Sequence, residues 1–180
     1  MKTMLAVGTL AAAVASAASA DVTYTLTSQT FAGFNFVEAA TAGSLSGTLT
    51  GASINVVLNA SVSWTYADDL AVYVAGTPLA AGGMLQCGGY SNLQAGQRYF
   101  WPNGGSSAVG TTSIGTVNFT TGIDMAANPT MSVWIGNGYG AAGTSGTWSG
   151  TITLHGVNEV PAPGAIALLG LAGLAGRRRR

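Results

Sequence analysis

Charge is scarce in this chain of 180 residues, and most of its cations lie at the two ends. Charged residues make up 7% of the sequence, and five of the six cations are Lys2 and the four terminal arginines. Between the ends, Arg98 stands against six acidic residues, which gives a formal net charge of −5. Because phosphate backbones are bound by Lys and Arg, this composition argues strongly against nucleic-acid binding.

Cysteine and histidine are each present only once. Since Cys87 has no partner in the chain, an intramolecular disulfide is impossible, and the fold must depend on its hydrophobic core. We expect Cys87 to be buried as a small hydrophobic residue; an intermolecular disulfide or a reactive thiol is the alternative. One cysteine and one histidine fall short of the three or four protein ligands of a zinc site.

No catalytic constellation is recognisable. The sequence has no Gly-x-Ser-x-Gly elbow and no His-x-x-x-His pair, and His155 has no serine or acidic neighbour in a hydrolase pattern. We expect this histidine to lie at a strand end and to be satisfied by backbone or water. The chain is therefore predicted to have no catalytic residues and not to be an enzyme. A hydrolase with an unrecognised carboxylate pair is a distant alternative.

Residues 1–20 are typical of a secretory signal peptide. One lysine precedes an apolar run over residues 4–14, and Ala18-Ser19-Ala20 is the small-x-small pattern that signal peptidase accepts. We predict a helical signal peptide cleaved after Ala20, which leaves Asp21 as the first mature residue. The alternative is a buried N-terminal helix, but such an Ala-rich helix without a polar face has no reason to stop at this tripeptide.

Residues 160–180 have three parts: a proline-containing motif, an apolar run and four arginines. An apolar run over residues 165–176 is, as a helix, about 18 Å long, well short of the roughly 30 Å hydrocarbon core of a bilayer. The arginines that follow it are expected to stay cytoplasmic under the positive-inside rule. This pattern predicts a short hydrophobic helix that holds the chain at the inner membrane only transiently. The motif before the run is Val160, Pro161, Ala162, Pro163 and Gly164, and the cytoplasmic stop is Arg177, Arg178, Arg179 and Arg180.

With these parts in this order, the tail resembles those of PEP-CTERM proteins, the substrates of exosortase-type sorting enzymes. Ala162 stands where the family motif has Glu, as in a Val-Pro-Ala-Pro-Gly variant. The resemblance implies that an exosortase-type enzyme cuts near residues 161–164. It also implies delivery to the cell surface or extracellular matrix, often alongside exopolysaccharide, and no particular activity for the central domain.

The central domain, residues 21–159, is predicted to be all-β. Alternation of apolar and polar residues over 54–66 predicts one long strand, or two that meet at a bend, with the even-numbered face buried. We place Trp64 and Trp148 in the core for the same reason. Shorter alternating segments bring the total to about eight strands: residues 22–26, 45–49, 70–74, 117–119, 131–135 and 148–154.

Glycine-rich segments such as Thr121-Gly122 are expected to form the turns between these strands. Ser-Gly-Thr recurs at Ser46, Ser145 and Ser149 with unequal spacing, which favours strand edges over a repeat architecture. Since a parallel sheet would need helical crossovers, we predict a single antiparallel β-sandwich. Residues 68–74 and 146–154 resemble strands of galactose-binding-like jelly rolls, such as the P domain of proprotein convertases, and this resemblance favours a jelly roll.

Two groups of residues are candidates for binding. Tyr90, Trp101 and Tyr139 lie among turn-forming residues, where exposed rings could stack on a sugar; alternatively, they close the ends of the sandwich. Asp68 and Asp69 could offer oxygens to Ca²⁺, but a calcium site needs six or more, and a solvated turn with capping carboxylates is the favoured alternative. No other cofactor is predicted.

Three classes of function follow from these patterns. The first is a non-enzymatic exported protein of the cell surface or extracellular matrix. The second is a carbohydrate-binding module for exopolysaccharide, and the third is the hydrolase named above. The sequence does not identify the ligand of the central domain.

Overall fold

The computed structural model describes residues 21–78, 82–90 and 95–161. The signal-peptide residues Ala18 and Ala20, the two predicted flanking helices, and the tail from Ala162 to Arg180 lie outside the described residues. Within the described ranges, no helix is long and apolar enough to cross a membrane.

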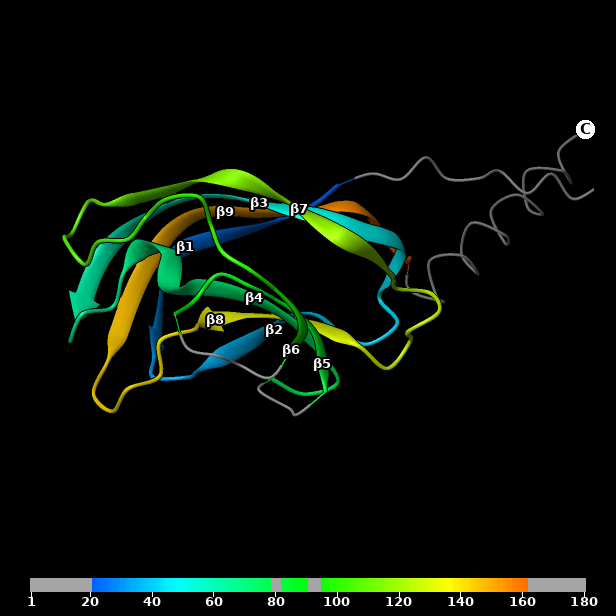
Figure 1. The fold of residues 1–180 in the computed structure, drawn as a ribbon, viewed down its shortest axis with the longest axis horizontal. Coiled ribbons are helices and arrows are strands. Elements are labelled where there is room, and N and C mark those ends of the chain that lie inside the picture. The colour runs from blue at the N-terminus through cyan, green and yellow to red at the C-terminus, as the bar shows by residue number, and fades with distance from the viewer. Residues whose placement is uncertain (1–20, 79–81, 91–94, 162–180) are drawn as a thin grey trace, which may run out of the picture.

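Two β-sheets stacked face to face form the domain, which confirms the all-β prediction (Figure 1). The first sheet has four strands, in the order β1 (Val22–Ala32), β9 (Ser145–Glu159), β3 (Leu45–Val62) and β7 (Thr112–Asp124). The second has five, in the order β2 (Phe36–Ala40), β8 (Ser132–Asn137), β4 (Leu70–Ala75), β5 (Gly83–Cys87) and β6 (Ala95–Tyr99). Neighbouring strands are antiparallel except β5 and β6, which pair in parallel, so the sandwich is mostly rather than wholly antiparallel.

The described residues contain nine strands rather than eight, and their boundaries differ from the prediction in three ways. Residues 45–49 and the start of the alternating segment belong to one strand, β3, and the predicted turn at Thr121-Gly122 lies inside β7. Strands β2, β5 and β6 were not predicted. They lack a period-2 signal, because β5 is buried on both faces and β6 has few apolar residues.

The core lies between the two sheets. Trp148 on β9 is fully buried against Phe31 on β1, with ring centroids 6.1 Å apart, and its Nε1 donates a hydrogen bond to the carbonyl of Ala67 at 3.0 Å. Cys87 is buried as expected, and this burial raises the pKa of its thiol. Both placements agree with the sequence-based predictions.

The even-numbered face of residues 54–66 is buried only in its first half. Ile54, Val56 and Leu58 are at most 2% exposed. The prediction is wrong for the remaining even positions, all of which are exposed: Ala60, Val62, Trp64 and Tyr66. The pairing of β3 with β9 shifts register between Leu58 and Ala60, so the alternation reverses before the strand ends at Val62. Beyond the strand, Ser63 and Trp64 have positive φ values, and Thr65 is buried.

Both ends of the described chain lie in the same half of the first sheet. Val22 pairs with Leu154, and Leu45 pairs with Glu159. Val160, the first residue of the predicted sorting motif, is exposed, and its N–H donates to the carbonyl of Ser44 at 2.8 Å. The chain therefore leaves the sandwich directly at the motif.

Candidate ligand-binding site

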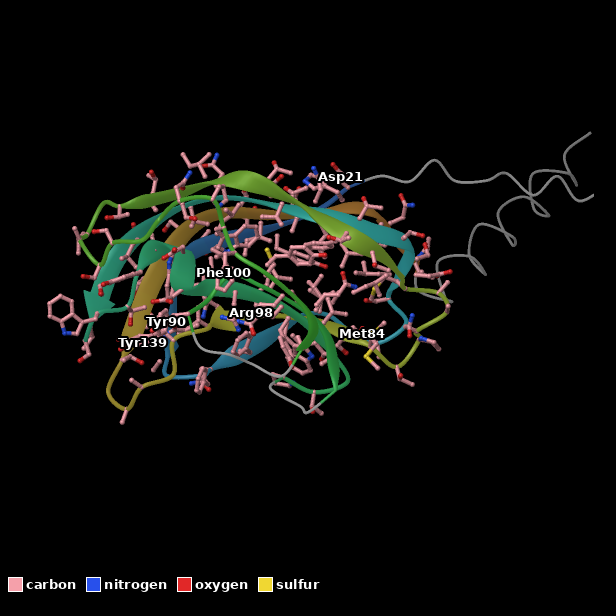
Figure 2. All side chains as sticks on the ribbon, in the orientation of Figure 1. Asp21, Met84, Tyr90, Arg98, Phe100 and Tyr139 are labelled. Carbon is pink, nitrogen blue, oxygen red and sulfur yellow. The ribbon has the colours of Figure 1, made fainter. Side chains whose placement is uncertain are left out.

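Four aromatic side chains surround a hollow of about 290 Å³ at the end of the sandwich opposite Asp21 (Figure 2). They come from the connections that follow β3, β5 and β8, and the hollow, here called the aromatic cleft, is lined by Trp64, Tyr66, Asp69, Tyr90 and Tyr139. Trp64 and Tyr90 are 73% and 78% exposed. The rings of Tyr90 and Tyr139 meet edge to face, with centroids 6.1 Å apart. Two of the three predicted glycan-contact residues are therefore adjacent.

Asp69 joins the connections that carry these rings. It ends the short 3₁₀ turn Ala67–Asp69 and is 3% exposed. One carboxylate oxygen accepts the N–H of Tyr66 at 2.7 Å, and the other accepts the N–H of Tyr90 at 3.1 Å. Its carbonyl accepts the N–H of Gly138, next to Tyr139, at 2.7 Å. A single residue thus fixes the backbone beside three of the four rings.

Trp64 is held outward by an unusual backbone conformation. Ser63 and Trp64 have φ values of +54° and +66°, in the left-handed region that side chains other than Gly, Asn and Asp rarely adopt. Such strain is found most often at functional sites. At Trp64 this strained backbone accompanies an indole that is 73% exposed.

Trp101 does not belong to the aromatic cleft. It is 4% exposed, and its Nε1 donates to the carbonyl of Leu70 at 2.7 Å, so the expected exposure is wrong and the alternative, a ring that closes an end of the sandwich, fits better. The residues around Trp101 are typical of a turn, but the segment after β6 lies over the open end of the core and so buries this ring. Phe100, its neighbour, is exposed, and Arg98 stacks on the Phe100 ring at 4.7 Å from the centroid.

A second, smaller hollow of about 80 Å³ adjoins the aromatic cleft. This side pocket shares Tyr66, Asp69 and Tyr90 with the cleft. Its other lining residues are Asp68, Gly89, Phe100 and Trp101. Both members of the acidic pair therefore line it.

A calcium site needs six or more oxygen ligands, and Asp68 and Asp69 supply only a few of them. No cluster of three or more His, Cys, Asp or Glu residues able to hold a metal occurs within residues 21–78, 82–90 and 95–161. Desolvation by burial raises the pKa of Asp68, and it raises the pKa of Asp69 to about 6 in spite of the two N–H groups that Asp69 accepts. The capping role proposed for the acidic pair fits Asp69, whose carboxylate accepts the N–H three residues before it.

A Ser, His and Asp network, which the sequence analysis missed, lies on the outer face of the first sheet. His155 is inside β9 rather than at its end, and its Nε2 is 2.6 Å from the hydroxyl of Ser53 on β3. Its Nδ1 is 2.8 Å from the carboxylate of Asp21, and this hydrogen bond lowers the pKa of Asp21. The three residues are far apart in sequence, so only the strand pairing brings them together.

The hydrogen bonds of this network join the same residue types as those of a catalytic triad. The oxyanion hole and the substrate pocket of such a triad are not found beside Ser53 in the described part of the chain. Ser53 lies on an inner strand and pairs with Thr116 on one side and Thr153 on the other, so its backbone groups belong to the sheet and cannot form an oxyanion hole. Its hydroxyl is also 2.7 Å from that of Thr116. The aromatic cleft and the side pocket lie at the other end of the domain (Figure 2). We therefore assign the network to holding Asp21 on the sheet.

Comparison with known proteins gives no relative to set beside this geometry: no protein-family model, curated protein or solved structure matches the chain.

Proposed function

We propose that this chain is an exported, non-enzymatic protein of the cell surface or extracellular matrix that binds carbohydrate in the aromatic cleft. The observation that carries the proposal is the group of exposed aromatic rings around Asp69. A binding site for sugar needs flat apolar surfaces with fixed positions, together with a few polar groups that set orientation. The cleft has both.

The rings can serve the two faces of a pyranose. Trp64 and Tyr90 offer large exposed surfaces against which sugar C–H groups can stack. The hydroxyls of Tyr90 and Tyr139 make no hydrogen bond to another described residue, so they are available to sugar hydroxyls. The hydrogen bonds of Asp69 hold the surrounding backbone in advance of binding, which lowers the entropy lost when a ligand is ordered.

The position of the cleft suits a protein displayed from a membrane. Tyr90 and Tyr139 lie at the left of the sandwich, whereas Asp21 lies on the upper sheet to the right of its middle (Figure 2), and the orange end of the described chain is on the right as well (Figure 1). A domain held by its C-terminal tail would therefore present the cleft outward. The proposed route is export, removal of residues 1–20 by signal peptidase, transient holding in the inner membrane, and cutting near residues 161–164 by an exosortase-type enzyme. The jelly-roll form of the sandwich is part of the same proposal.

Substitution of Trp64 tests sugar binding. In Trp64→Ala, we expect affinity for a bound glycan to fall at least about tenfold, which corresponds to about 1.4 kcal/mol, because a stacking surface is lost. The fold should survive, since the indole is 73% exposed. A glycan array identifies the ligand, and isothermal titration measures its affinity.

Val37→Ala is a matched control, because Val37 is a 46% exposed apolar residue on β2 that does not line the cleft. It should bind as the parent protein does. An array on which the intact protein binds no glycan would reject the binding proposal and favour the first class, a matrix component without a sugar ligand.

The sorting tail has its own test in the native host. Replacing Arg177–Arg180 with serine should remove the cytoplasmic stop and release uncut protein, because the positive charges that resist translocation are gone. Replacing them with lysine keeps the charge and should leave processing intact. Mass spectrometry of surface-released material should give a parent species that begins at Asp21 and lacks the arginines. A surface fraction made mostly of full-length C-termini would mean that the tail is a permanent anchor.

A further inference from the structure

The aromatic cleft continues into a second compartment with a different chemistry. Tyr66, Asp69 and Tyr90 line both the cleft and the side pocket, so a ligand stacked on the rings would lie next to the pocket. At about 80 Å³ the pocket is too small for a sugar ring but can take a single substituent. What that substituent is depends on the two carboxylates that line it.

Neither carboxylate of the side pocket is neutralised by a cation of the protein. Within the described ranges, the carboxylate that lies beside a basic side chain is that of Asp21, which hydrogen-bonds His155 at the outer face of the first sheet. Each oxygen of Asp69 accepts one backbone N–H, which leaves further acceptor capacity on both. Asp68 lies beside it and is half-buried. A carboxylate taken out of water without a counter-charge is costly, and a bound cation would offset that cost.

Arg98 does not line the side pocket, but it contacts two residues that do, Gly89 and Tyr90. Its guanidinium donates to the side-chain oxygen of Gln86 at 3.0 Å and to the carbonyls of Gly89 and Tyr90 at 3.0 and 2.9 Å. It also stacks on Phe100. Arg98 thus shapes the loop beside the pocket, while the acidic pair remains available to a cation from outside.

We propose that the aromatic cleft selects a sugar that carries a protonated amino group, with the ring against Trp64 and Tyr90 and the ammonium in the side pocket between Asp68 and Asp69. This inference rests on the proposed carbohydrate binding and names its ligand class. An ammonium has three donors for the acceptor positions of the two carboxylates. The faces of Trp and Tyr rings attract cations as well, and the net charge of −5 of the central domain, residues 21–159, favours their approach.

Three oligosaccharides of equal length and the same β-1,4 linkage test the inference: one of glucosamine, one of N-acetylglucosamine and one of glucose. Isothermal titration at about pH 6.5, just above the pKa of about 6 at Asp69, keeps that carboxylate mostly ionised. The glucosamine oligomer is expected to bind at least about tenfold more tightly than the other two. Equal affinities would overturn the inference and leave carbohydrate binding standing. If none of the three binds, both proposals fail for these sugars and the inference is rejected with them.

Charge-removing variants locate the preference. Asp68→Asn should bring the affinity for the glucosamine oligomer close to that for the acetylated one. Glu38→Gln is the matched control: it removes the same charge from an exposed position on β2, outside both hollows, and should keep the preference. Asp68 is the first choice because Asp69 supports the fold; circular dichroism checks the structure of each variant. A preference that survives in folded Asp68→Asn and Asp69→Asn would place the cation elsewhere and overturn the inference.

Discussion

Val56→Asp is expected to prevent folding or to lower the free energy of unfolding by about 4 kcal/mol or more. Val56 is 2% exposed on β3, an inner strand of the first sheet, so the new carboxylate would face the core without a partner. Urea unfolding followed by tryptophan fluorescence measures the effect. A protein that remains folded with nearly unchanged stability would contradict the placement of this face in the core.

The same strand supplies two controls. Val62→Asp makes the identical change at another even-numbered position, but Val62 is 50% exposed, so the loss should be within about 0.5 kcal/mol. Asn55→Asp, next to Val56 on the exposed face, should be equally mild. A large loss at Val62 as well would mean that the even face is buried over its full length and that the reversal after Leu58 is wrong.

That reversal marks the limit of period-2 reasoning in this chain. Alternation predicts strands well, because inward and outward residues must alternate on a pleated strand. It contains no information about a one-residue register shift such as that between Leu58 and Ala60, which depends on the pairing with β9. Trp64 was therefore assigned to the core, whereas the structure leaves it 73% exposed. Trp101 lay outside the alternating segments, so this reasoning could not decide between an exposed ring and one that closes an end of the sandwich.

The sequence also predicted part of the candidate site, namely the part that depends on local patterns. Tyr90 and Tyr139 stood out as aromatic residues among turn formers, and the structure brings them together. The adjacent acids were visible too, but the role of Asp69 depends on backbone N–H groups from two separate connections. The contact of Asp21 with His155 joins residues 134 positions apart, which only the strand order explains. No local pattern could have indicated it.

The Ser-Gly-Thr recurrence was expected at strand edges, and this holds for two of its three copies. Ser46 and Ser145 lie at the beginning of β3 and β9, whereas the third copy, from Ser149, lies inside β9. Glycine inside a strand often marks a bulge or a close approach of another backbone. Gly150, in the third copy, is a case of close approach, since it lies against Asn55 and Val56, and its φ is +133°.

Gly150→Ala is accordingly expected to be among the most damaging single-methyl changes in the domain. A Cβ at this position would lie 2.1 Å from the carbonyl oxygen of Asn55 and 2.7 Å from the Cα of Val56. Both are backbone atoms of an inner strand, so neither can move without disturbing the sheet. Together with the strained φ, the clash should lower the free energy of unfolding by about 3–5 kcal/mol, measured by urea unfolding.

Gly143→Ala separates the clash from the backbone strain. Gly143 also has a positive φ, +77°, but a Cβ there would meet nothing within 4 Å. Its substitution should therefore cost only the left-handed conformation, roughly 1–2 kcal/mol. Similar losses at the two positions would show that β9 can move away from β3 at Gly150. The pairing of these strands also sets the register after Leu58, and so the outward position of Trp64 at the cleft; mobility there would weaken the case for a rigid binding site.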